Sequence, residues 1–413
     1  MLVEKVETRT GLDWVCDVTF LIFLSVLVGF GPNAKDLFLL AEILFIVIFS
    51  ARFLIRRSLL SWYTLWSATL VILGLLSTTY APSRESAMTV VISLVQVVLF
   101  GNLIVPYFMD SKRNRDTFYR VFIVAGVVLA LHLLSTASLE QLMNSRIGGT
   151  ININANRVGF SFAICSIIAS HLVITEKRYW YIFFVVFFAI ASMFSGSRKV
   201  MALLVIGIFL IGLFTREPSW KSFGTLLGIV LLLFSLFYLA YQWEPLYNVL
   251  GSRIDTFIAI FTNGGTDGST SIRLTMMQDG WRLFLEKPLL GWGLNAFREI
   301  VEYEMYSHNN YIEILVSLGS IGFIWYFGFL LLLCFQGGKQ LLTGKRTNSI
   351  VLSLALLCTF FVDYMGRVHL YNEITHIIYA FSFAAVYSEK PQTGFDVVTW
   401  VEKRLHLGRK VAQ

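Results

Sequence analysis

A short basic segment lies between two apolar runs of the sequence. Arg198 and Lys199 follow Ser195-Gly196-Ser197 in a connection of only a few residues. A short connection holds an arginine close to the membrane surface, where its charge is costly unless it pairs with an anion or lines water. The alternative is that both side chains simply extend to lipid headgroups. Arg198 is therefore a candidate anion-binding residue.

A second candidate is Arg273, which comes directly after Ser269-Thr270-Ser271. Apolar residues recur at helical spacing from 273 to 287 and Pro288 follows, so we expect an amphipathic helix that Arg273 opens. Free backbone N–H groups at a helix N-terminus and a guanidinium group together suit a phosphate. An ordinary solvated arginine is the alternative interpretation.

The third group is the segment 308–313, which reads His-Asn-Asn-Tyr-Ile-Glu and directly precedes an apolar run. A neutral imidazole at a helix entry can accept a proton from a hydroxyl group near pH 7. A histidine at a membrane interface can also be only a polar anchor. His308 is the candidate catalytic residue. Other polar residues could line the same cavity, namely Asn156, Arg157, Lys199, Asn309, Glu313, Arg367 and His376.

Motifs for metals and nucleotides are absent from the sequence. There is no Walker loop, no HExxH, no Cys/His metal spacing and no DxD-type carboxylate pair. We therefore expect chemistry without a metal ion, ATP or another cofactor. The four cysteines lie in or beside apolar runs and are expected to act as small hydrophobic residues. Glu42, inside an apolar run, is either functional or a buried hydrogen-bonding group.

The composition excludes a soluble protein. Of 413 residues, 56% are hydrophobic and only 14% are charged, against roughly 25% charged residues in soluble domains. The mean hydropathy is +0.69. The net charge is +7. In a membrane protein the positions of Lys and Arg indicate its orientation, because these residues concentrate in cytoplasmic loops. The charge does not indicate nucleic-acid binding.

Apolar runs long enough to cross a bilayer define an all-α polytopic membrane protein with about twelve transmembrane helices. The first is expected to be retained, since no cleavage site follows it. The predicted spans are 14–31, 37–55, 59–77, 87–107, 118–134, 157–175, 179–195, 200–214, 223–241, 310–335, 348–363 and 373–387.

Basic residues alternate between the connections as they should if both termini are cytoplasmic. This topology puts the three candidate groups on the outer face. We expect nine spans in 1–241, an extracytoplasmic cap with amphipathic helices in 242–309, three spans in 310–387 and a basic cytoplasmic tail in 388–413. Gly319 and Gly322 in the tenth span are spaced for close helix packing.

One stretch of about 50 residues resembles a known family. It contains Ser271-Ile272-Arg273-Leu274, then Pro288-Leu289-Leu290-Gly291-Trp292-Gly293, then His308-Asn309, and then Gly319-Ser320-Ile321-Gly322. This combination resembles the conserved region of the bacterial O-antigen ligase and O-antigen (capsular polysaccharide) polymerase family. The span number, the large outer loop and the arginine in a short outer loop also resemble that family.

The resemblance implies a GT-C-like glycosyltransferase that takes an oligosaccharide from undecaprenyl pyrophosphate on the outer face of the bacterial plasma (inner) membrane. It implies that Arg198 and Arg273 hold the pyrophosphate and that His308 activates or orients the acceptor hydroxyl. The implied partners are the lipid-linked donor, a glycan acceptor and membrane lipids, with a flippase and a chain-length regulator as further candidates.

Three functions remain open at this point. A repeat-unit polymerase making O-antigen, capsule or exopolysaccharide is the first interpretation. An O-antigen ligase that transfers the glycan to lipid A core or another terminal acceptor is the alternative. The ligase branch typically has Leu four residues after the first arginine, where this sequence has Ala202, and this departure favours the polymerase. A lipid-linked sugar flippase or transporter is the second alternative, although such proteins usually have related halves.

Overall fold

The computed structural model describes residues 10–31, 34–136, 138, 153–215, 268–303, 305–388 and 395–396, with isolated positions between 220 and 255. Nearly all of these residues are helical. The longer elements are α1 (Gly11–Gly29), α2 (Lys35–Ile55), α3 (Trp62–Ser77), α4 (Arg84–Asp110), α5 (Lys112–Thr136), α7 (Ala155–Glu176), α8 (Ile182–Met193), α9 (Arg198–Thr215), α13 (Gly268–Glu286), α15 (Asn310–Leu342), α16 (Asn348–Asp363) and α17 (Glu373–Tyr387). Shorter elements are β1 (Leu59–Leu60), η3 (Tyr179–Tyr181), α14 (Ala296–Ile300) and β2 (Phe395–Asp396).

The helices form a bundle whose outer surface is apolar. Among the described residues, seven helices are long and apolar enough to cross a membrane: α1, α2, α4, α5, α7, α9 and α15. Helices α3 and α16 and the η3–α8 segment are apolar but shorter. Large apolar side chains such as Leu40, Ile92 and Phe335 are 64%, 63% and 67% exposed. A surface of this kind suits lipid and not water, as in a polytopic membrane protein.

Helices α7 and α17 occupy the centre of the bundle. Every residue from 374 to 386 in α17 is buried, and so is every residue from 158 to 172 in α7. A helix that is buried on all sides has protein and not lipid around it. Small residues such as Ala380 and Ala384 in α17 provide room for close neighbours.

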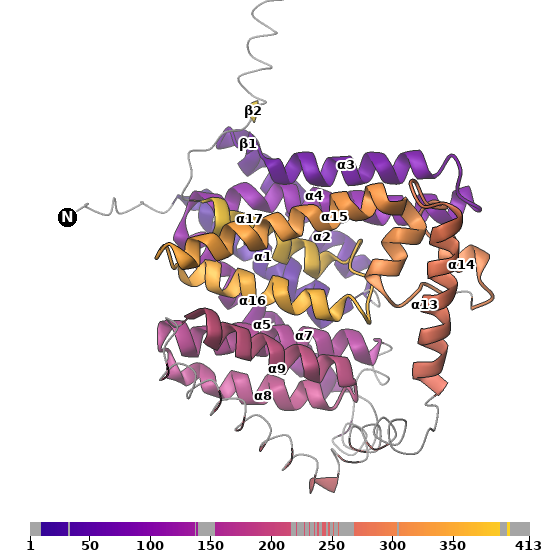
Figure 1. Cartoon of the computed structure of the whole chain (residues 1–413). Helices are drawn as coiled ribbons and strands as arrows, with labels where there is room; N and C mark the ends of the chain where they lie inside the picture. The colour runs from indigo at the N-terminus through magenta and orange to yellow at the C-terminus, as the bar shows by residue number, and fades with distance from the viewer. Residues whose placement is uncertain are drawn as a thin grey trace, which may run out of the picture.

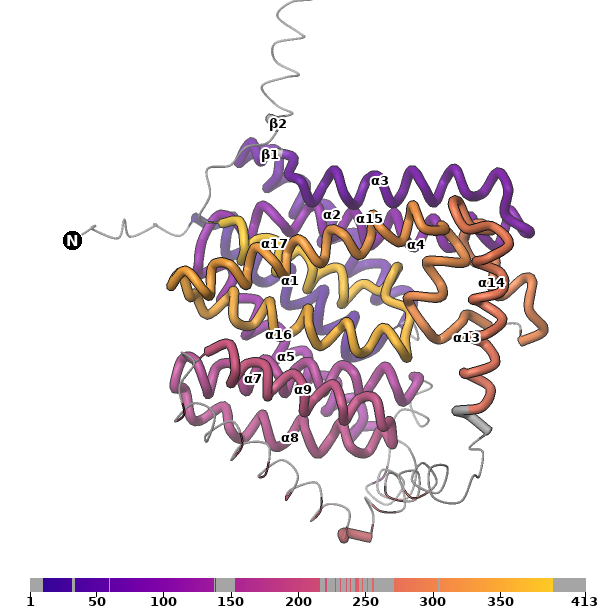
Figure 2. The backbone as a smooth tube through the Cα atoms, in the orientation of Figure 1, coloured from indigo at the N-terminus to yellow at the C-terminus, as the bar shows by residue number. Residues whose placement is uncertain are grey.

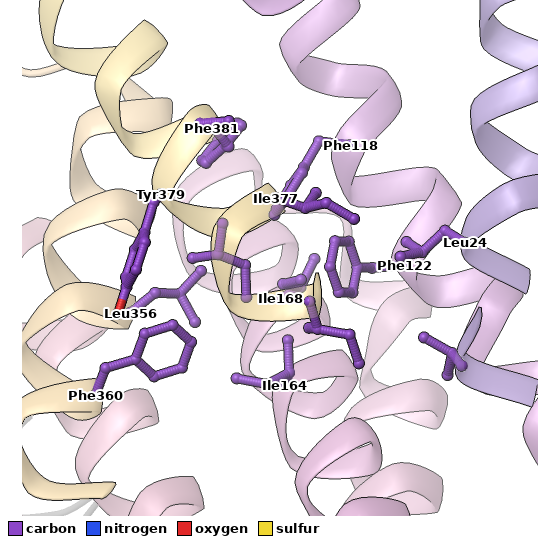
Figure 3. Packing of buried hydrophobic residues seen from close by; sticks show 14 of the residues in the cluster. Leu24, Phe118, Phe122, Ile164, Ile168, Leu356, Phe360, Ile377, Tyr379 and Phe381 are labelled. Carbon is purple, nitrogen blue, oxygen red and sulfur yellow. The ribbon is translucent and has the colours of Figure 1, made fainter. Parts of the chain in front are cut away.

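Large side chains interlock where these central helices meet α5 and α16. Figure 3 shows Phe118 and Phe122 of α5 facing Ile377 and Phe381 of α17, with Ile164 and Ile168 of α7 beside them. The rings of Phe118 and Phe381 stack with centroids 4.0 Å apart and planes 12° from parallel. Offset stacked rings add to the free energy of burial.

One end of the bundle carries helices that run in a different direction. In Figure 1, α13 lies crosswise to the bundle, over the ends of the long helices at the right, with α14 beside it. Strand β1, which pairs antiparallel with β2, lies toward the opposite end. The two ends of the bundle therefore differ in construction.

Helix α15 is broken at Gly319, which has φ 64° and ψ −165°. This region of backbone conformation is essentially open only to glycine. The break frees backbone groups on both sides of it, and buried backbone groups must be paired. The segment 288–293 pairs with them.

Four hydrogen bonds join the segment 288–293 to the break. The amides of Trp292 and Gly293 donate to the carbonyls of Val316 (2.7 Å) and Ser317 (3.0 Å). The amides of residues 320 and 321 donate to the carbonyls of residues 288 and 289, at 2.8 and 3.3 Å. The backbones come so close that a Cβ on Gly319 would lie 2.2 Å from the Leu289 carbonyl oxygen.

The structure corrects the interpretation of Gly319 as a helix-packing residue. Its small size serves contact with a loop backbone, and its conformation breaks the helix. The helix periodicity of the apolar residues continues on both sides of the break, so the sequence pattern alone indicated a continuous span.

The predicted spans outside 223–241 each coincide with a helix or, for 179–195, with η3 and α8. The span 223–241 and most of the tail 388–413 lie outside the described residues. The third span begins later than expected, because residues 59–60 form β1 and the helix starts at Trp62. Glu42 is buried in α2 and accepts a hydrogen bond from Gln96, which satisfies its side chain inside the protein.

We predict that Gly319→Ala lowers the free energy of unfolding by about 1–3 kcal/mol, because alanine strains this backbone conformation and meets the Leu289 carbonyl. The thermal unfolding midpoint of the purified protein in detergent measures the effect. Gly328→Ala in the same helix is the matched control, since nothing lies within 4 Å of its added Cβ. Equal melting of both variants would contradict the account of the break.

Candidate active site

The candidate residues gather at the end of the bundle that α13 crosses. Figure 2 shows the path of the chain there, where α13, the loop before α15 and the connection between α16 and α17 meet. The short connection 194–197 leads into α9 at the same end. Most of the polar residues selected from the sequence belong to these segments.

A tight turn presents His308 just before α15. His308 has a positive φ of 55°, a conformation in which histidine is enriched among non-glycine residues. Ser307 is fixed on one side, because its amide and Oγ both donate to Oε2 of Glu313, at 3.0 and 2.8 Å. Asn309 fixes the other side as the helix cap, and its Oδ1 accepts from the amides of residues 311 and 312. The predicted residues Asn309 and Glu313 therefore hold the turn that carries His308.

Asn310 ties this turn to the connection between α16 and α17. Its amide donates to the Tyr364 carbonyl at 2.8 Å, and its Oδ1 accepts from the amides of His369 and Leu370, at 2.8 and 3.2 Å. The side chain of Asn310 is completely buried. The position of the histidine turn is thus fixed relative to the last two helices.

His308 itself is half-buried in a positively charged environment. Burial, followed by the charges of Arg273 and Lys199, lowers the pKa of His308 to about 4. Its ring centroid lies 4.3 Å from that of Tyr306. The imidazole is therefore neutral at physiological pH, and one of its nitrogens is free of a proton.

The face of α13 that meets α15 includes Arg273. Met276, Gly280 and Leu283 are buried on that face, and Arg273 precedes Met276 by three residues, so it lies on the same side of the helix. A Cβ on Gly280 would lie 2.2 Å from Cγ2 of Ile312. This close approach of α13 to the first turn of α15 places the guanidinium group within electrostatic reach of His308.

The structure corrects the expected start of this helix. Helix α13 begins at Gly268 and not at Arg273, because the residues at 269–271 continue the helix and no proline stops it. The backbone amide of Arg273 is therefore inside the helix. Arg273 therefore does not combine its side chain with the free N–H groups of a helix N-terminus. Only its guanidinium group is available to bind an anion.

Lys199 of α9 is the second cation near His308. Its Nζ donates to the Gly366 carbonyl, and the charges of Arg367, Asp363 and Arg273 all act on it. Arg198 is half-buried at the first position of α9. The charge of Lys199, which was predicted to line the cavity, acts on His308.

Asp363 and Arg367 form a buried ion pair near Lys199. Asp363 accepts from His369 Nε2 at 2.8 Å and lies 3.4 Å from Nε of Arg367. The Arg367 guanidinium group also donates to the Asn156 carbonyl at 2.8 Å and lies 4.1 Å from the ring centroid of Phe160. Arg367 is therefore held rigidly, and Asn156 contributes its backbone oxygen to holding it.

Two other predicted lining residues have mainly structural contacts. Arg157 lies 3.4 Å from the Leu27 carbonyl, and its charge acts on Arg367. His376 is completely buried, with Nε2 2.8 Å from the Leu370 carbonyl and its ring stacked against Trp66. Its ring faces Trp66 and Tyr379 inside the bundle, so these contacts give His376 a structural role.

This arrangement can bind an anion and accept a proton beside it. Arg273 and Lys199 supply positive charge, and His308 supplies a neutral base. Tyr306 and Ser307 contribute to the site and were not selected from the sequence. The position of Ser307 directly before the histidine was the available signal. In the described part of the chain, no group of three or more His, Cys, Asp or Glu side chains could hold a metal ion.

Comparison with known families gives one match. Residues 183–327 match the family model described as O-antigen ligase. The matched segment extends from α8 into α15 and includes Arg198, Lys199, Arg273 and His308. It confirms the resemblance that the sequence motifs indicated. No curated protein matches the chain significantly.

We predict that Arg273→Gln raises the pKa of His308 from about 4 toward its ordinary value, because one of two neighbouring cations is removed. The value stays below the ordinary one since burial is unchanged. Titration of the histidine signals by NMR in lipid nanodiscs measures both forms. Arg298→Gln, at an exposed arginine of α14, is the control and should leave the pKa unchanged. An ordinary titration of His308 in the unsubstituted protein would contradict the assignment.

Proposed function

Since residues 183–327 belong to the O-antigen ligase family, we propose that the protein is a membrane glycosyltransferase that polymerises oligosaccharide repeat units. The donor is an oligosaccharide linked to undecaprenyl pyrophosphate, and the acceptor is a second lipid-linked glycan. The observation that carries this proposal is the neutral His308 beside Arg273 and Lys199. Those groups match the two chemical needs of the reaction, a base and an anion clamp.

The proposed reaction is a single displacement. The acceptor hydroxyl oxygen attacks the anomeric carbon of the donor glycan, and the bond from that carbon to the pyrophosphate oxygen breaks. His308 takes the hydroxyl proton, and undecaprenyl pyrophosphate leaves as the anion. Attack opposite the leaving group inverts the anomeric centre. General base catalysis of this kind contributes about 10²–10⁴-fold to the rate.

In the proposed reaction, positively charged side chains neutralise the pyrophosphate, as a metal ion does in other glycosyl transfers. Arg273 offers a planar fork that fits phosphate oxygens, with Arg198 at the start of α9 as its expected partner. Lys199 adds a charge within reach of His308. Charge that is already in place when the pyrophosphate leaves lowers the barrier without reorganisation.

The proposed topology has twelve spans in a GT-C-like arrangement, with both termini in the cytoplasm and the site on the outer face of the plasma membrane. In this scheme 1–241 and 310–387 are the membrane domain, 242–309 is the cap and 388–413 is the basic tail. The crosswise position of α13 (Figure 1) supports a cap at the membrane surface. Leu274 and Trp281, which are seven residues apart and so lie on one side of α13, are both exposed, as in an interfacial helix.

The acceptor distinguishes the two enzymatic candidates. Ala202, at a position where ligases typically have Leu, supports the polymerase. The description of the matched family as O-antigen ligase supports the second candidate, transfer to lipid A core or another terminal acceptor. A transporter is disfavoured, because Arg273, Lys199 and His308 gather at one end of the bundle and not at its middle.

The test is reconstitution with the lipid-linked repeat unit alone. In nanodiscs without divalent metals, we predict a ladder of products that differ by one repeat. His308→Ala should lower the rate by at least about 10²-fold. The control His132→Ala, at a half-buried histidine of α5 whose Nδ1 lies 2.7 Å from the Gly29 carbonyl, should retain it. Transfer only after addition of lipid A core or a protein acceptor would establish the ligase instead. No transfer under either condition would contradict both.

We also predict that Arg273→Lys lowers kcat/KM by about tenfold or more, because lysine cannot form the two parallel hydrogen bonds of a guanidinium group to phosphate. Initial rates at low donor concentration measure it. Arg298→Lys in α14 is the matched control. Unchanged kcat/KM in Arg273→Lys would mean that Arg273 is not part of the clamp.

A further inference from the structure

A polar cavity of about 230 Å³ lies near the opposite end of the bundle from His308. Helix α7 runs from one end to the other. In its first turn the Asn156 carbonyl accepts a hydrogen bond from Arg367, and its last residue, Glu176, lines the cavity. The first turns of α5 and the short helix η3 complete the walls. None of the cavity residues belongs to the candidate active site.

The cavity wall is positively charged overall. Three arginines line it, Arg113, Arg120 and Arg178, against the two carboxylates Asp116 and Glu176. Each arginine keeps donors available: Arg113 lies 3.8 Å from Asp17, Arg120 donates from NH2 to Thr117 Oγ1, and Arg178 pairs with Glu176 through Nε. Lys112 and Arg115 also act on Asp116 from α5. An anionic ligand therefore fits the charge of the wall better than a cation.

The cavity lies at the level where a membrane surface is expected. Tyr179 and Trp180 of η3 are each 63% exposed, and such aromatic residues mark the interface of a bilayer. The neighbouring Tyr181 lines the cavity. The chain then continues into α8, where Phe183 is 67% exposed and Val186 47% exposed. The charged cavity thus opens beside an apolar face that lipid chains can cover.

We propose that this cavity binds the phosphodiester headgroup of an anionic membrane phospholipid. The phosphate meets the guanidinium groups of Arg113, Arg120 and Arg178, and the acyl chains lie along the exposed face of α8. Basic pockets between transmembrane helices are suited to such headgroups. Buried Tyr119, whose hydroxyl donates to Ser349 Oγ at 3.2 Å, forms a fixed part of the wall. The inference is independent of the proposed glycan transfer.

The test is lipid binding by the purified full-length protein in detergent, read by native mass spectrometry. Phosphatidylglycerol and phosphatidylcholine with identical chains are the probes. We expect one phosphatidylglycerol to bind each protein more tightly than phosphatidylcholine. The Arg113→Gln/Arg120→Gln variant should lose about fivefold in affinity for each arginine, given about 1 kcal/mol per basic group near a lipid surface.

Arg346→Gln is the matched control, because this half-buried arginine precedes α16 and does not line the cavity. Its affinity should equal that of the unsubstituted protein, and all forms should show the same thermal midpoint. Equal binding of the two lipids, or unchanged binding in the double variant, would overturn the proposal. Displacement of phosphatidylglycerol by millimolar inorganic phosphate would assign the cavity to a soluble anion and also overturn it.

Discussion

The geometry of the candidate site depends on the pairing between the broken helix α15 and the segment 288–293. The break at Gly319 frees carbonyls and amides on both sides of it, and the backbone of 288–293 pairs with them. That segment follows α13 directly, so the pairing also fixes α13 against the first turn of α15. Arg273 on α13 and His308 before α15 are thereby held in one relative position, which a catalytic site requires.

The second constraint is electrostatic. A chain with only 14% charged residues places Arg273, Lys199 and Arg367 near one another, balanced among the described contacts by the buried Asp363. Such a surplus of positive charge is costly at a membrane surface unless an anion binds. Burial, followed by the charges of Arg273 and Lys199, lowers the pKa of His308 and keeps it neutral, so the base depends in part on the cations of the anion site. A pyrophosphate donor and a hydroxyl acceptor would use both.

The sequence predicted the helices well, because runs of apolar residues long enough for a bilayer have few other structures available. It also selected Arg273, as the residue expected to open an amphipathic helix, and His308, as a histidine directly before an apolar run. It did not predict the break in α15, because a glycine in the sequence is compatible both with close helix packing and with a positive φ. Nor did it predict that the charge of Lys199 acts on His308, because the direction of this side chain depends on the packing of α9. His376 was selected by residue type, yet its ring stacks on Trp66 of α3, which is distant in the sequence.

The most direct measurement is a cryo-electron microscopy structure of the protein in nanodiscs with undecaprenyl pyrophosphate bound. The account predicts density for the two phosphates between Arg273 and Lys199, with the His308 imidazole facing the position that the anomeric carbon would occupy. Density for the pyrophosphate elsewhere, with Arg273 and His308 both out of contact with it, would contradict the account.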